Sequence, residues 1–536
     1  MSALKGYDAI VLGAGHNGLV AAAYLARAGR SVLVLERRER VGGAIDTVEL
    51  APGVRVPAVA HTVGRMRPSV ARELDLKHHG LALIAPDVRA FAPQPDGRSV
   101  ALWRDVAATQ ASLRAWSEAD ATAYAEFDTR VRALSRFLAD LGQETPPDVR
   151  NPGLGDALTG LRLGRAFKGL GRDGGRTILR VLAMAVADFV GESFESDPVR
   201  ATLAWRGVRH TAMGPWSAGT TKVLLDDAAG SDGGASGETV YAQGGPGALA
   251  EALASAARAA GAQIRTGTDV VAVTSDDGRV TGVALATGEE ISARTILAGL
   301  DPKRLLTTLV DPVAIGPSLR WRASNIRTPG KVAKVNLVLD GLPDFPAAKD
   351  DPRLLRGRIL VGMTGIDAVE RVFDATKYGC FADELVVEVT IPSLVDPSLV
   401  AGATEGTHVL SAHVQWVPTT PREGTWDDRR EHLGDAVMRT LETVAPGITG
   451  RIRTRQVLTP MDLERDYGLT GGHPLHVEPG LDSFFAWRPL LGHARYRMPL
   501  EGLYLAGSGA HPGGGVTGLP GRNAARAVLE DLRRRR

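Results

Sequence analysis

The sequence is poor in residues that build covalent or metal-bound chemistry. It has one cysteine, Cys380, so a disulfide within the chain and a Cys-x-x-Cys redox pair are both excluded. It has no His-Glu-x-x-His motif and no cluster of Cys and His, and we therefore expect no metal site. A Gly-x-Ser-x-Gly elbow is also missing, which leaves acyl-transfer chemistry without a nucleophile. This use of cysteine fits a reducing cytoplasm.

Long apolar runs and an excess of charge are missing too. No stretch approaches the ~20 apolar residues needed to cross a bilayer, and the run Ala9–Leu12 is too short for a secretion signal. The formal net charge of +2 gives no reason to expect a nucleic acid partner. We expect a cytoplasmic protein. The basic run Arg533–Arg536 is either a solvated helix end or a peripheral contact with an anionic membrane surface.

The sequence does contain a glycine-rich turn between a strand and a helix. The β-rich run Tyr7–Leu12 precedes Gly13–Gly18, in the pattern Gly-x-Gly-x-x-Gly, and the Ala- and Leu-rich stretch Leu19–Ala28 follows at helical spacing. A second apolar strand, Ser31–Leu35, ends at Glu36. This β-α-β unit predicts dinucleotide binding, because an acidic residue follows the glycines by about 20 positions.

Each part of this motif has a physical task. Gly13 permits the tight turn, Gly15 lets the backbone approach a pyrophosphate, and Gly18 lets the helix pack closely on the strand. The helix N-terminus supplies positive potential to the phosphates. Glu36 can accept hydrogen bonds from an adenosine ribose, and its charge argues against a 2′-phosphate. The motif alone does not separate FAD from NAD, and an ordinary glycine-rich turn is the alternative interpretation.

Two further features favour FAD. The pair Gly42-Gly43 follows Glu36 closely, where the chain can pass the phosphates. Near the C-terminus, the strand 503–506 leads into a glycine-rich loop, 507–521, and a final helix. An NAD dehydrogenase has no need of a distant segment that returns to the nucleotide. No second Gly-x-Gly-x-x-Gly follows a strand, so we expect no dedicated NAD(P)H site and reoxidation of the flavin by oxygen or a quinone.

The pattern predicts an α/β fold with two domains, each assembled from separated segments. A Rossmann-like FAD-binding domain of the two-dinucleotide-binding type is expected from residues 1–70, 236–310 and 496–536. An α+β substrate domain is expected from residues 71–235 and 311–495. The first of these two segments predicts mainly helices. It ends in a stretch rich in Gly, Ser and Asp, 227–237, which we interpret as a flexible surface loop.

Three motifs carry a resemblance to a known family. They are Gly13–Leu19 (GAGHNGL), Gly244–Leu249 (GGPGAL) and His511–Asn523 (HPGGGVTGLPGRN). Together they are similar to the motifs of phytoene-desaturase-related flavoproteins, within the amine-oxidase-like superfamily. The branch that the chain resembles most holds the single-protein β-carotene ketolases and the pyridine nucleotide-disulphide oxidoreductase domain-containing proteins. The likeness covers nearly the whole chain and is specific for FAD and the fold. It says little of the substrate, because members act on polyenes, retinoids and amines.

The resemblance implies which residues would hold FAD. The pyrophosphate would lie on the first glycine turn and the ribose on Glu36, while the backbone of Val271 would meet the adenine. The C-terminal loop would pass under the ribityl chain and the isoalloxazine. Many flavoproteins have an Asp where this chain has Ser508, so the ribityl contact must come from elsewhere, such as backbone amides. The predicted cofactor-binding residues are Gly13, Gly15, His16, Asn17, Gly18, Glu36, Arg37, Gly42, Gly43, Val271, Gly507, Ser508, Gly515, Val516, Thr517 and Gly518.

Two residues are candidates for catalysis. Lys334, in the strand-like run Val332–Leu339, is similar in position to an amine-oxidase lysine that reaches flavin N5 through a water. A cation or donor there would stabilise developing negative charge; a solvated strand lysine is the alternative. His511 lies in the C-terminal loop, where its near-neutral pKa suits proton handling. A role in fixing the shape of the loop is the alternative for His511.

The expected reaction is removal of a hydride from an organic, lipophilic substrate by FAD. Trp205, His210 and Trp216 are candidates for lining the substrate cavity, and burial in the core is the alternative for the tryptophans. A carotenoid or polyprenoid desaturase or ketolase is the leading hypothesis. The alternatives are an amine-oxidase-like enzyme on a smaller substrate, and an FAD-bound scaffold protein without turnover.

Overall fold

A five-stranded parallel sheet forms the first half of the molecule. The structure is a computed structural model that describes residues 6–149, 152–231 and 233–534. The sheet has the order β19-β13-β1-β2-β9, and its strands are Ala9–Leu12 (β1), Val32–Leu35 (β2), Gln263–Arg265 (β9), Ile296–Ala298 (β13) and Leu503–Leu505 (β19). β1 lies at the centre and is fully buried, as its uninterrupted apolar sequence predicts.

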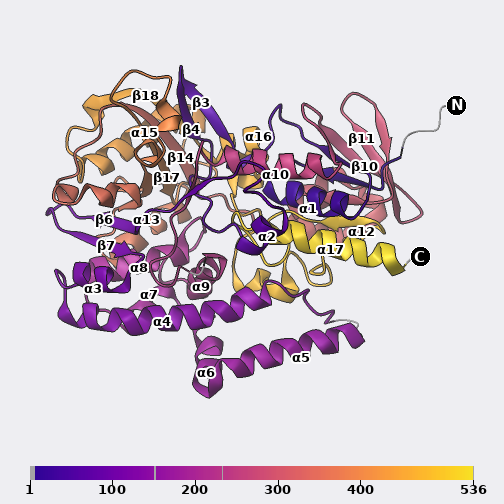
Figure 1. Cartoon of the computed structure of the whole chain (residues 1–536), viewed down its shortest axis with the longest axis horizontal. Coiled ribbons are helices and arrows are strands. Elements are labelled where there is room, and N and C mark those ends of the chain that lie inside the picture. The colour runs from indigo at the N-terminus through magenta and orange to yellow at the C-terminus, as the bar shows by residue number, and fades with distance from the viewer. Residues whose placement is uncertain (1–5, 150–151, 232, 535–536) are drawn as a thin grey trace.

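Three helices pack on this sheet, and they come from three distant parts of the chain. They are His16–Arg27 (α1), Gly247–Ala259 (α10) and Leu519–Arg534 (α17). α1 contacts both α10 and α17 (Figure 1). An antiparallel sheet of Val270–Asp276 (β10), Arg279–Leu285 (β11) and Glu290–Ser292 (β12) lies beside them. The expected Rossmann-like domain is present.

A seven-stranded mixed sheet forms the second half. Its order is β18-β14-β17-β16-β15-β6-β7, and its strands are Val88–Pro93 (β6), Ser99–Trp103 (β7), Val332–Asp340 (β14), Arg358–Val361 (β15), Val386–Thr390 (β16), Thr407–Gln415 (β17) and Ile452–Leu458 (β18). The helix Trp426–Glu442 (α15) packs on β18. This is the expected substrate domain, with most of its strands from the later segment.

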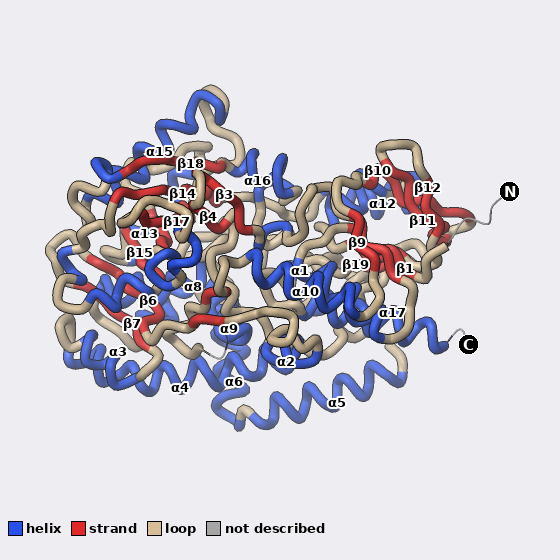
Figure 2. The backbone as a smooth tube through the Cα atoms, turned by 45° about the horizontal axis from the view of Figure 1, so that its top comes forward, coloured by secondary structure: helices blue, strands red, loops and turns tan. Residues whose placement is uncertain are grey.

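Helices from the earlier segment form a layer below that sheet (Figures 1 and 2). They are Val106–Leu113 (α3), Glu118–Leu141 (α4), Leu154–Gly169 (α5), Gly171–Val181 (α6), Val186–Gly191 (α7), Asp197–Val208 (α8) and Thr220–Ser231 (α9). α3, α4, α8 and α9 pack on one another, whereas α5 and α6 stand at the lower edge of the molecule. The helical prediction is confirmed, apart from β6 and β7, which join the sheet, and the short strand Leu83–Ile84 (β5), which pairs with Tyr241–Ala242 (β8).

Two local features differ from the sequence-based expectations. The hairpin of Thr47–Ala51 (β3) and Val54–Pro57 (β4) belongs to the first FAD-binding segment, but it packs on β14 and β17 of the other domain. The stretch 227–237 is not a surface loop. α9 extends to Ser231, and residues 233–237 are buried because they pack on α4 and α8, where Ala235 bonds to Asp128.

Among the described residues, no helix combines the length and apolarity needed to cross a membrane. The expected membrane contact of Arg533–Arg536 falls partly outside the described residues, which end at residue 534. Arg534 forms an i,i+4 ion pair with Glu530 in the last turn of α17.

Candidate active site

The turn between β1 and α1 has the geometry of an anion-binding helix N-terminus. Gly15 is the N-cap and places no side chain over the first amide groups of α1. Gly13 has a φ of +89°, and a Cβ on Gly18 would lie 2.1 Å from the carbonyl oxygen of Gly13. The turn therefore requires glycine at both positions. Gly13, Gly15, His16 and Asn17 line a groove, toward which the N-terminus of α1 is directed.

Glu36 lies at the end of β2, beside this turn. Its carboxylate is buried and accepts hydrogen bonds from the amides of Ala14, at 2.7 Å, and Arg38, at 3.0 Å. The two amides fix the carboxylate in the wall of the groove. That is where an acid must lie to accept hydrogen bonds from ribose hydroxyls.

Gly42, Gly43 and Arg37 also line the groove, whereas Val271 does not. Gly42 has a φ of +116° and forms a β-bridge with Gly15, and Gly43 lies beside it in the wall. Arg37 lines the groove and donates a hydrogen bond to the carbonyl of Arg465. Val271 does not line the groove: its side chain is 46% exposed, and Val270 takes its place in the wall. The adenine contact of Val271 stays a prediction.

The C-terminal loop returns to the same groove. A Cβ on Gly507 would lie 2.4 Å from the carbonyl oxygen of Leu300, so the loop passes close to the sheet. Asn17 of α1 donates a hydrogen bond to the hydroxyl of Ser508 at 3.1 Å. The ring of His16 hydrogen-bonds with the carbonyl of Gly515 at 3.2 Å. These contacts join the N-terminal turn to the C-terminal loop across nearly the whole length of the chain.

The groove adjoins a second cavity. His16, Ala44, Pro474 and Ser508 line both, so the two lie next to each other. Gly515, Val516 and Thr517 line the cavity alone, and Gly518 packs against Met66 instead. An elongated dinucleotide would fit across the two, with its pyrophosphate at α1 and its ring system beside residues 513–517. The residues present therefore fit FAD.

Lys334, the third residue of β14, projects into the wall of this cavity. It is fully buried, and its Nζ lies 2.8 Å from Nδ1 of His61. Its neighbours across the sheet are His413 on β17 and Leu458 on β18. Burial lowers the pKa of Lys334 well below its usual range, although the charge of Glu388 opposes this shift. A side chain buried in this way is not a solvated strand lysine.

Behind Lys334 lies a buried cluster centred on Glu388 of β16. The carboxylate lies 3.3 Å from Nε2 of His61 and 3.2 Å from Nε of Arg209, and it accepts a hydrogen bond from the indole of Trp205. Burial opposes its ionisation, but the charges of Arg209 and Arg358 hold the pKa of Glu388 well below its usual range. Glu388 is therefore a fixed negative charge next to His61.

His61 connects Lys334 to this charge. Burial, together with the nearby Lys334, lowers the pKa of His61 to about 3. The neutral imidazole can accept a hydrogen bond from Lys334 at Nδ1 and present its Nε2 proton to Glu388. The sequence motifs identified neither His61 nor Glu388. A charged residue within the otherwise apolar strand Val386–Thr390 was the available signal for Glu388.

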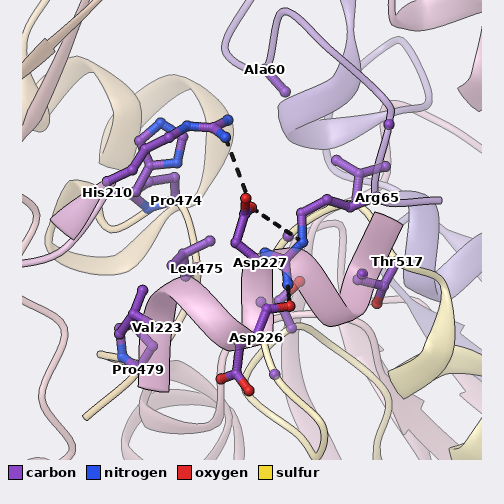
Figure 3. Close-up of a pocket in the computed structure, with 18 of the residues that line it drawn as sticks. Ala60, Arg65, His210, Val223, Asp226, Asp227, Pro474, Leu475, Pro479 and Thr517 are labelled. Carbon is purple, nitrogen blue, oxygen red and sulfur yellow. Dashed lines mark hydrogen bonds and ion pairs between the residues drawn. The ribbon is translucent and has the colours of Figure 1, made fainter. Parts of the chain in front are cut away.

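A second carboxylate, Asp227 of α9, lies in the wall of the same cavity, with Arg209 between it and Glu388. It forms ion pairs with Arg206 at 2.7 Å and with Arg65 at 3.6 Å, and Figure 3 shows it pointing toward Arg65. Burial opposes its ionisation, but Arg206 and Arg65 lower the pKa of Asp227. This residue falls in the stretch expected to be a surface loop, so it was missed for the same reason as the end of α9.

Three buried side chains come close enough together to hold a metal ion by distance alone. The ligand atoms of His61, Glu388 and His413 lie within 4.8 Å of one another. Their other contacts oppose a cation: Lys334 bonds to His61, Arg209 pairs with Glu388, and His413 bonds to the carbonyl of Val59. We assign no metal to this cluster, because an added cation would be repelled by the neighbouring positive charges.

His511 does not line the cavity. Its Nε2 lies 3.1 Å from the carbonyl of Leu141, at the end of α4, and its ring packs edge-on against Phe485. Burial lowers the pKa of His511 to about 3. This position favours the alternative, a role in the shape of the loop, over proton handling at the flavin. The following residues, Pro512–Gly515, do line the cavity.

Of the three predicted substrate residues, only His210 lines the cavity. Its ring lies 3.2 Å from Nδ1 of His413 and it points inward beside Pro474 (Figure 3). Trp205 is buried behind the wall, where it bonds to Glu388. Trp216 is 44% exposed and donates a hydrogen bond to Asp367 at the surface. The expectation that Trp205 and Trp216 line the cavity is therefore corrected. Helix α8 and the turn after it direct both side chains away from the cavity.

Comparison with known proteins agrees with this geometry. The family model for flavin containing amine oxidoreductases matches residues 18–529. A rat protein, pyridine nucleotide-disulfide oxidoreductase domain-containing protein 2, is 36% identical over 98% of this chain and 94% of its own. Hydroxyneurosporene desaturase of Cereibacter sphaeroides is 28% identical over 98% of this chain and 97% of its own. Cyclohexylamine oxidase from Brevibacterium oxydans has a similar fold, with a TM-score of 0.56 at 18% identity, and the match covers 98% of this chain and 100% of that one.

The family match spans nearly the whole chain, and the groove and cavity fit its cofactor. The cofactor is FAD, and the chain is related to the phytoene desaturases, as the motifs implied. The chain belongs to the family of flavin containing amine oxidoreductases.

Proposed function

We propose that this protein is an FAD-dependent oxidoreductase that oxidises a lipophilic organic substrate, with the chemistry of a carotenoid or polyprenoid desaturase or ketolase. When bound, FAD would accept a hydride from a substrate C–H bond and pass two electrons to oxygen or a quinone. The observation that carries the proposal is the cavity beside the loop Pro512–Thr517. It combines apolar walls, such as Val59, Val223 and Leu475, with the buried Lys334.

The residues of the chain have distinct roles in this proposal. The glycine turn and Glu36 bind the cofactor, and the apolar walls exclude water from the reacting atoms. Lys334 supplies a hydrogen-bond donor at the cavity wall, where His61 and Glu388 hold its side chain in one position. Glu388 does not act on the substrate directly, because it lies behind His61 and is already paired with Arg209.

The desaturase relative supports the lipophilic substrate, because its name places it on hydroxyneurosporene. The amine-oxidase-like alternative is supported by the fold of cyclohexylamine oxidase and by the position of Lys334. An FAD-bound scaffold without turnover is the third candidate. Burial of Lys334 argues against it, since a buried amine costs stability that a scaffold would have no reason to retain.

A peripheral membrane contact fits the same proposal, since a lipophilic substrate would reach a cytoplasmic enzyme through a bilayer surface. The structure offers α5 and α6 for this contact. Leu158, Leu161 and Leu179 are 62%, 53% and 68% exposed on these helices. Exposed basic side chains surround them at Arg162, Arg165, Lys168, Arg172 and Arg176. A surface with leucines and basic residues together fits an anionic bilayer.

Anaerobic mixing tests the proposed function. The purified holoprotein would be mixed with a panel of polyenes and of primary amines while the visible absorbance of the flavin is followed. Bleaching by a polyene and not by amines is the expected result, and bleaching by amines alone would favour the alternative. A preparation without flavin bands, even after FAD is added, would refute the central claim. Rapid bleaching by NADPH would refute the absence of a nicotinamide site.

A further inference from the structure

The cavity beside the flavin loop carries a large excess of positive charge. Eight lysine and arginine side chains line it among the described residues, against two aspartates. The cations are Arg65, Arg67, Arg206, Arg209, Lys222, Lys334, Arg358 and Arg488, and the aspartates are Asp226 and Asp227. Glu388, directly behind the wall, adds a third carboxylate. A neutral polyene would need none of these charges.

The excess of positive charge in the cavity remains when the protonation states of its lysines and arginines are taken into account. Burial lowers the pKa of Lys334 and of Lys222. Burial also lowers the pKa values of Arg67, Arg358 and Arg488, but only to about 10, so these three guanidinium groups stay charged at neutral pH. Even without the two lysines, six arginines face three carboxylates.

Two of the three carboxylates are already shared among several cations, and the third, Asp226, pairs with Lys222 at 2.6 Å. Asp227 pairs with Arg65 and Arg206, and Glu388 pairs with Arg209 and lies 3.7 Å from Arg358. Arg67 and Arg488 have no acidic partner among the described residues and donate to backbone carbonyls. Positive charge without a matching carboxylate is therefore a property of the cavity as a whole.

The pyrophosphate of FAD does not explain these cations. The phosphate groove at α1 has its own basic residues, Arg37, Arg38 and Arg304, and none of them lines the cavity. Conversely, none of the eight cations of the cavity lines that groove. The two positive regions are separate, so the cavity has its own anion to meet.

Arg209, at the end of α8, has the most donors to offer. Its side chain is 15% exposed, and it lies between Glu388 at 3.2 Å and Asp227 at 4.0 Å. Its Nε faces Glu388 in the ion pair, and neither Nη1 nor Nη2 forms a hydrogen bond with the described residues. Arg206, one turn earlier, likewise has a buried Nη2 without a partner there. A guanidinium group with unused donors can take a carboxylate through two parallel hydrogen bonds.

We propose that the substrate of this cavity is an anionic amphiphile, an apolar chain that ends in a carboxylate, and that Arg209 binds the carboxylate. This inference rests on the proposed function and narrows its substrate class. The apolar walls at Val59, Val223 and Leu475 hold the chain, and the arginine-rich wall holds the head group. A protonated amine would meet like charge in the same place, which disfavours an amine substrate.

Binding of simple probes to the oxidised holoprotein tests this inference. Octanoate, octanamide, octyl phosphate and octylamine would be titrated separately, and the perturbation of the flavin absorbance would give each Kd. We expect octanoate to bind about tenfold or more tightly than octanamide, because a charged head group strengthens its hydrogen bonds to arginine. Octylamine should bind weakest. Equal binding of octanoate and octanamide would overturn the inference, and preference for octyl phosphate over octanoate would overturn the carboxylate in favour of a phosphate ester.

Two variants locate the recognition. Arg209→Met should reduce the preference for octanoate over octanamide to near unity. Arg200→Met is the matched control, because Arg200 lies on the same helix, pairs with Asp197 and is absent from the cavity wall. If Arg209→Met shifts only the reduction potential of the flavin and keeps the preference, Arg209 serves the flavin and the assignment is wrong. Should that variant not fold, the wild-type titrations still decide between anionic and neutral head groups.

The proposed function can fail separately. If the flavin is reduced by neutral polyenes while octanoate does not bind, the oxidase function stands and the anionic substrate is refuted. If octanoate binds but no lipophilic compound reduces the flavin, the anion site stands and the proposed function is refuted.

Discussion

At the scale of single residues, the cost of burying Lys334 is the most informative feature of the site. An isolated ammonium group inside a protein is strongly unfavourable, so a buried lysine either finds a charge partner or loses its proton. The nearest side chain to Lys334 is His61, which is itself held neutral, and Glu388 lies one residue further. The environment thus presents an amine that can donate or take up a proton at the cavity wall.

Replacing this amine should impair chemistry without loss of the cofactor. We expect Lys334→Met to retain FAD and to slow reduction of the flavin by substrate about a hundredfold, the usual effect of removing one preorganised donor. Stopped-flow absorbance under anaerobic conditions measures that rate. Lys331→Met is the matched control, since Lys331 lies just before the same strand and donates to the carbonyl of Thr376 outside the cavity. A Lys334→Met protein with the wild-type rate would remove Lys334 from the mechanism.

The buried His511 predicts a dependence of stability on pH. Its folded pKa of about 3 lies below the ordinary value of 6.5, so the unfolded chain binds the proton first as the pH falls. Above about pH 7 His511 is neutral in both the folded and the unfolded state, so it does not lower the free energy of unfolding. As the pH falls from 6.5 to 3, protonation of His511 in the unfolded chain lowers the free energy of unfolding by up to about 1.4 kcal/mol per pH unit.

His511→Gln should therefore weaken the acid sensitivity of the protein. The Tm of both proteins would be measured from pH 7.5 to pH 4.5, and the decrease with falling pH should be smaller for the variant. Some acid sensitivity should persist, because burial also depresses the pKa of His61. The comparison uses the slope, so a uniform loss of stability in the variant does not affect it. Parallel slopes would mean that the pKa of His511 is the same in the folded and unfolded states.

At the scale of elements, the crossing of α1 and α17 joins the two ends of the chain at the cofactor. A Cβ on Gly521 would lie 2.1 Å from the carbonyl oxygen of Asn17, in the first turn of α1. That turn is the phosphate-binding end of the helix. The close approach thus fixes the position of the cofactor-binding amides by packing, in addition to the hydrogen bond between Asn17 and Ser508.

Gly521→Ala should consequently loosen both the fold and the cofactor. The added methyl group would force the two helices apart, at a typical cost of about 1–3 kcal/mol, and we expect a lower Tm and less FAD per mole of purified protein. Gly160→Ala is the contrasting change, because Gly160 lies in α5 with no heavy atom near its would-be Cβ. There alanine should stabilise the helix by up to about 1 kcal/mol and leave the FAD content unchanged. Full FAD content in Gly521→Ala would show that the crossing can relax.

Helices and strands could be predicted from sequence where their apolar residues recur regularly or where a glycine marks their end. The strand Val332–Leu339 and the helix Ala248–Ala260 were expected within a residue of β14 and α10, because an apolar strand and an Ala-rich helix ending in glycine are local signals. β6 and β7 were missed, since their place in the sheet depends on a parallel contact between β6 and β15, more than 250 residues away. Sequence spacing carries no signal for such a contact.

At the scale of the whole molecule, the local part of the site could also be predicted from sequence, whereas the part built from distant segments could not. The nucleotide groove was predictable, because the glycine turn and Glu36 lie within a single β-α-β unit. The cavity was not, because His61, Asp227 and Glu388 come from three separate segments and meet only in the folded chain. Trp216 is a residue that the sequence wrongly places in the cavity. It follows α8, which lies close to the cavity, but the turn after α8 directs its side chain to the surface.

The shape of the molecule also makes the proposed membrane contact testable. The helices α5 and α6 stand apart from both sheets (Figure 2), so changes on them should not disturb the groove or the cavity. We expect the protein to sediment with vesicles rich in phosphatidylserine and not with vesicles of phosphatidylcholine, and added salt should weaken the binding.

The double substitution Leu158→Ser with Leu161→Ser should abolish that sedimentation, because two adjacent leucines on one helical face supply the apolar contact. Leu83→Ser is the control, since Leu83 is 55% exposed on a different element. Both variants should keep their FAD and their Tm. If the leucine variant still binds while a variant with Arg533 and Arg534 changed to Ser does not, the contact is made by the C-terminal helix. A lipophilic substrate would then enter from the side of the FAD-binding domain.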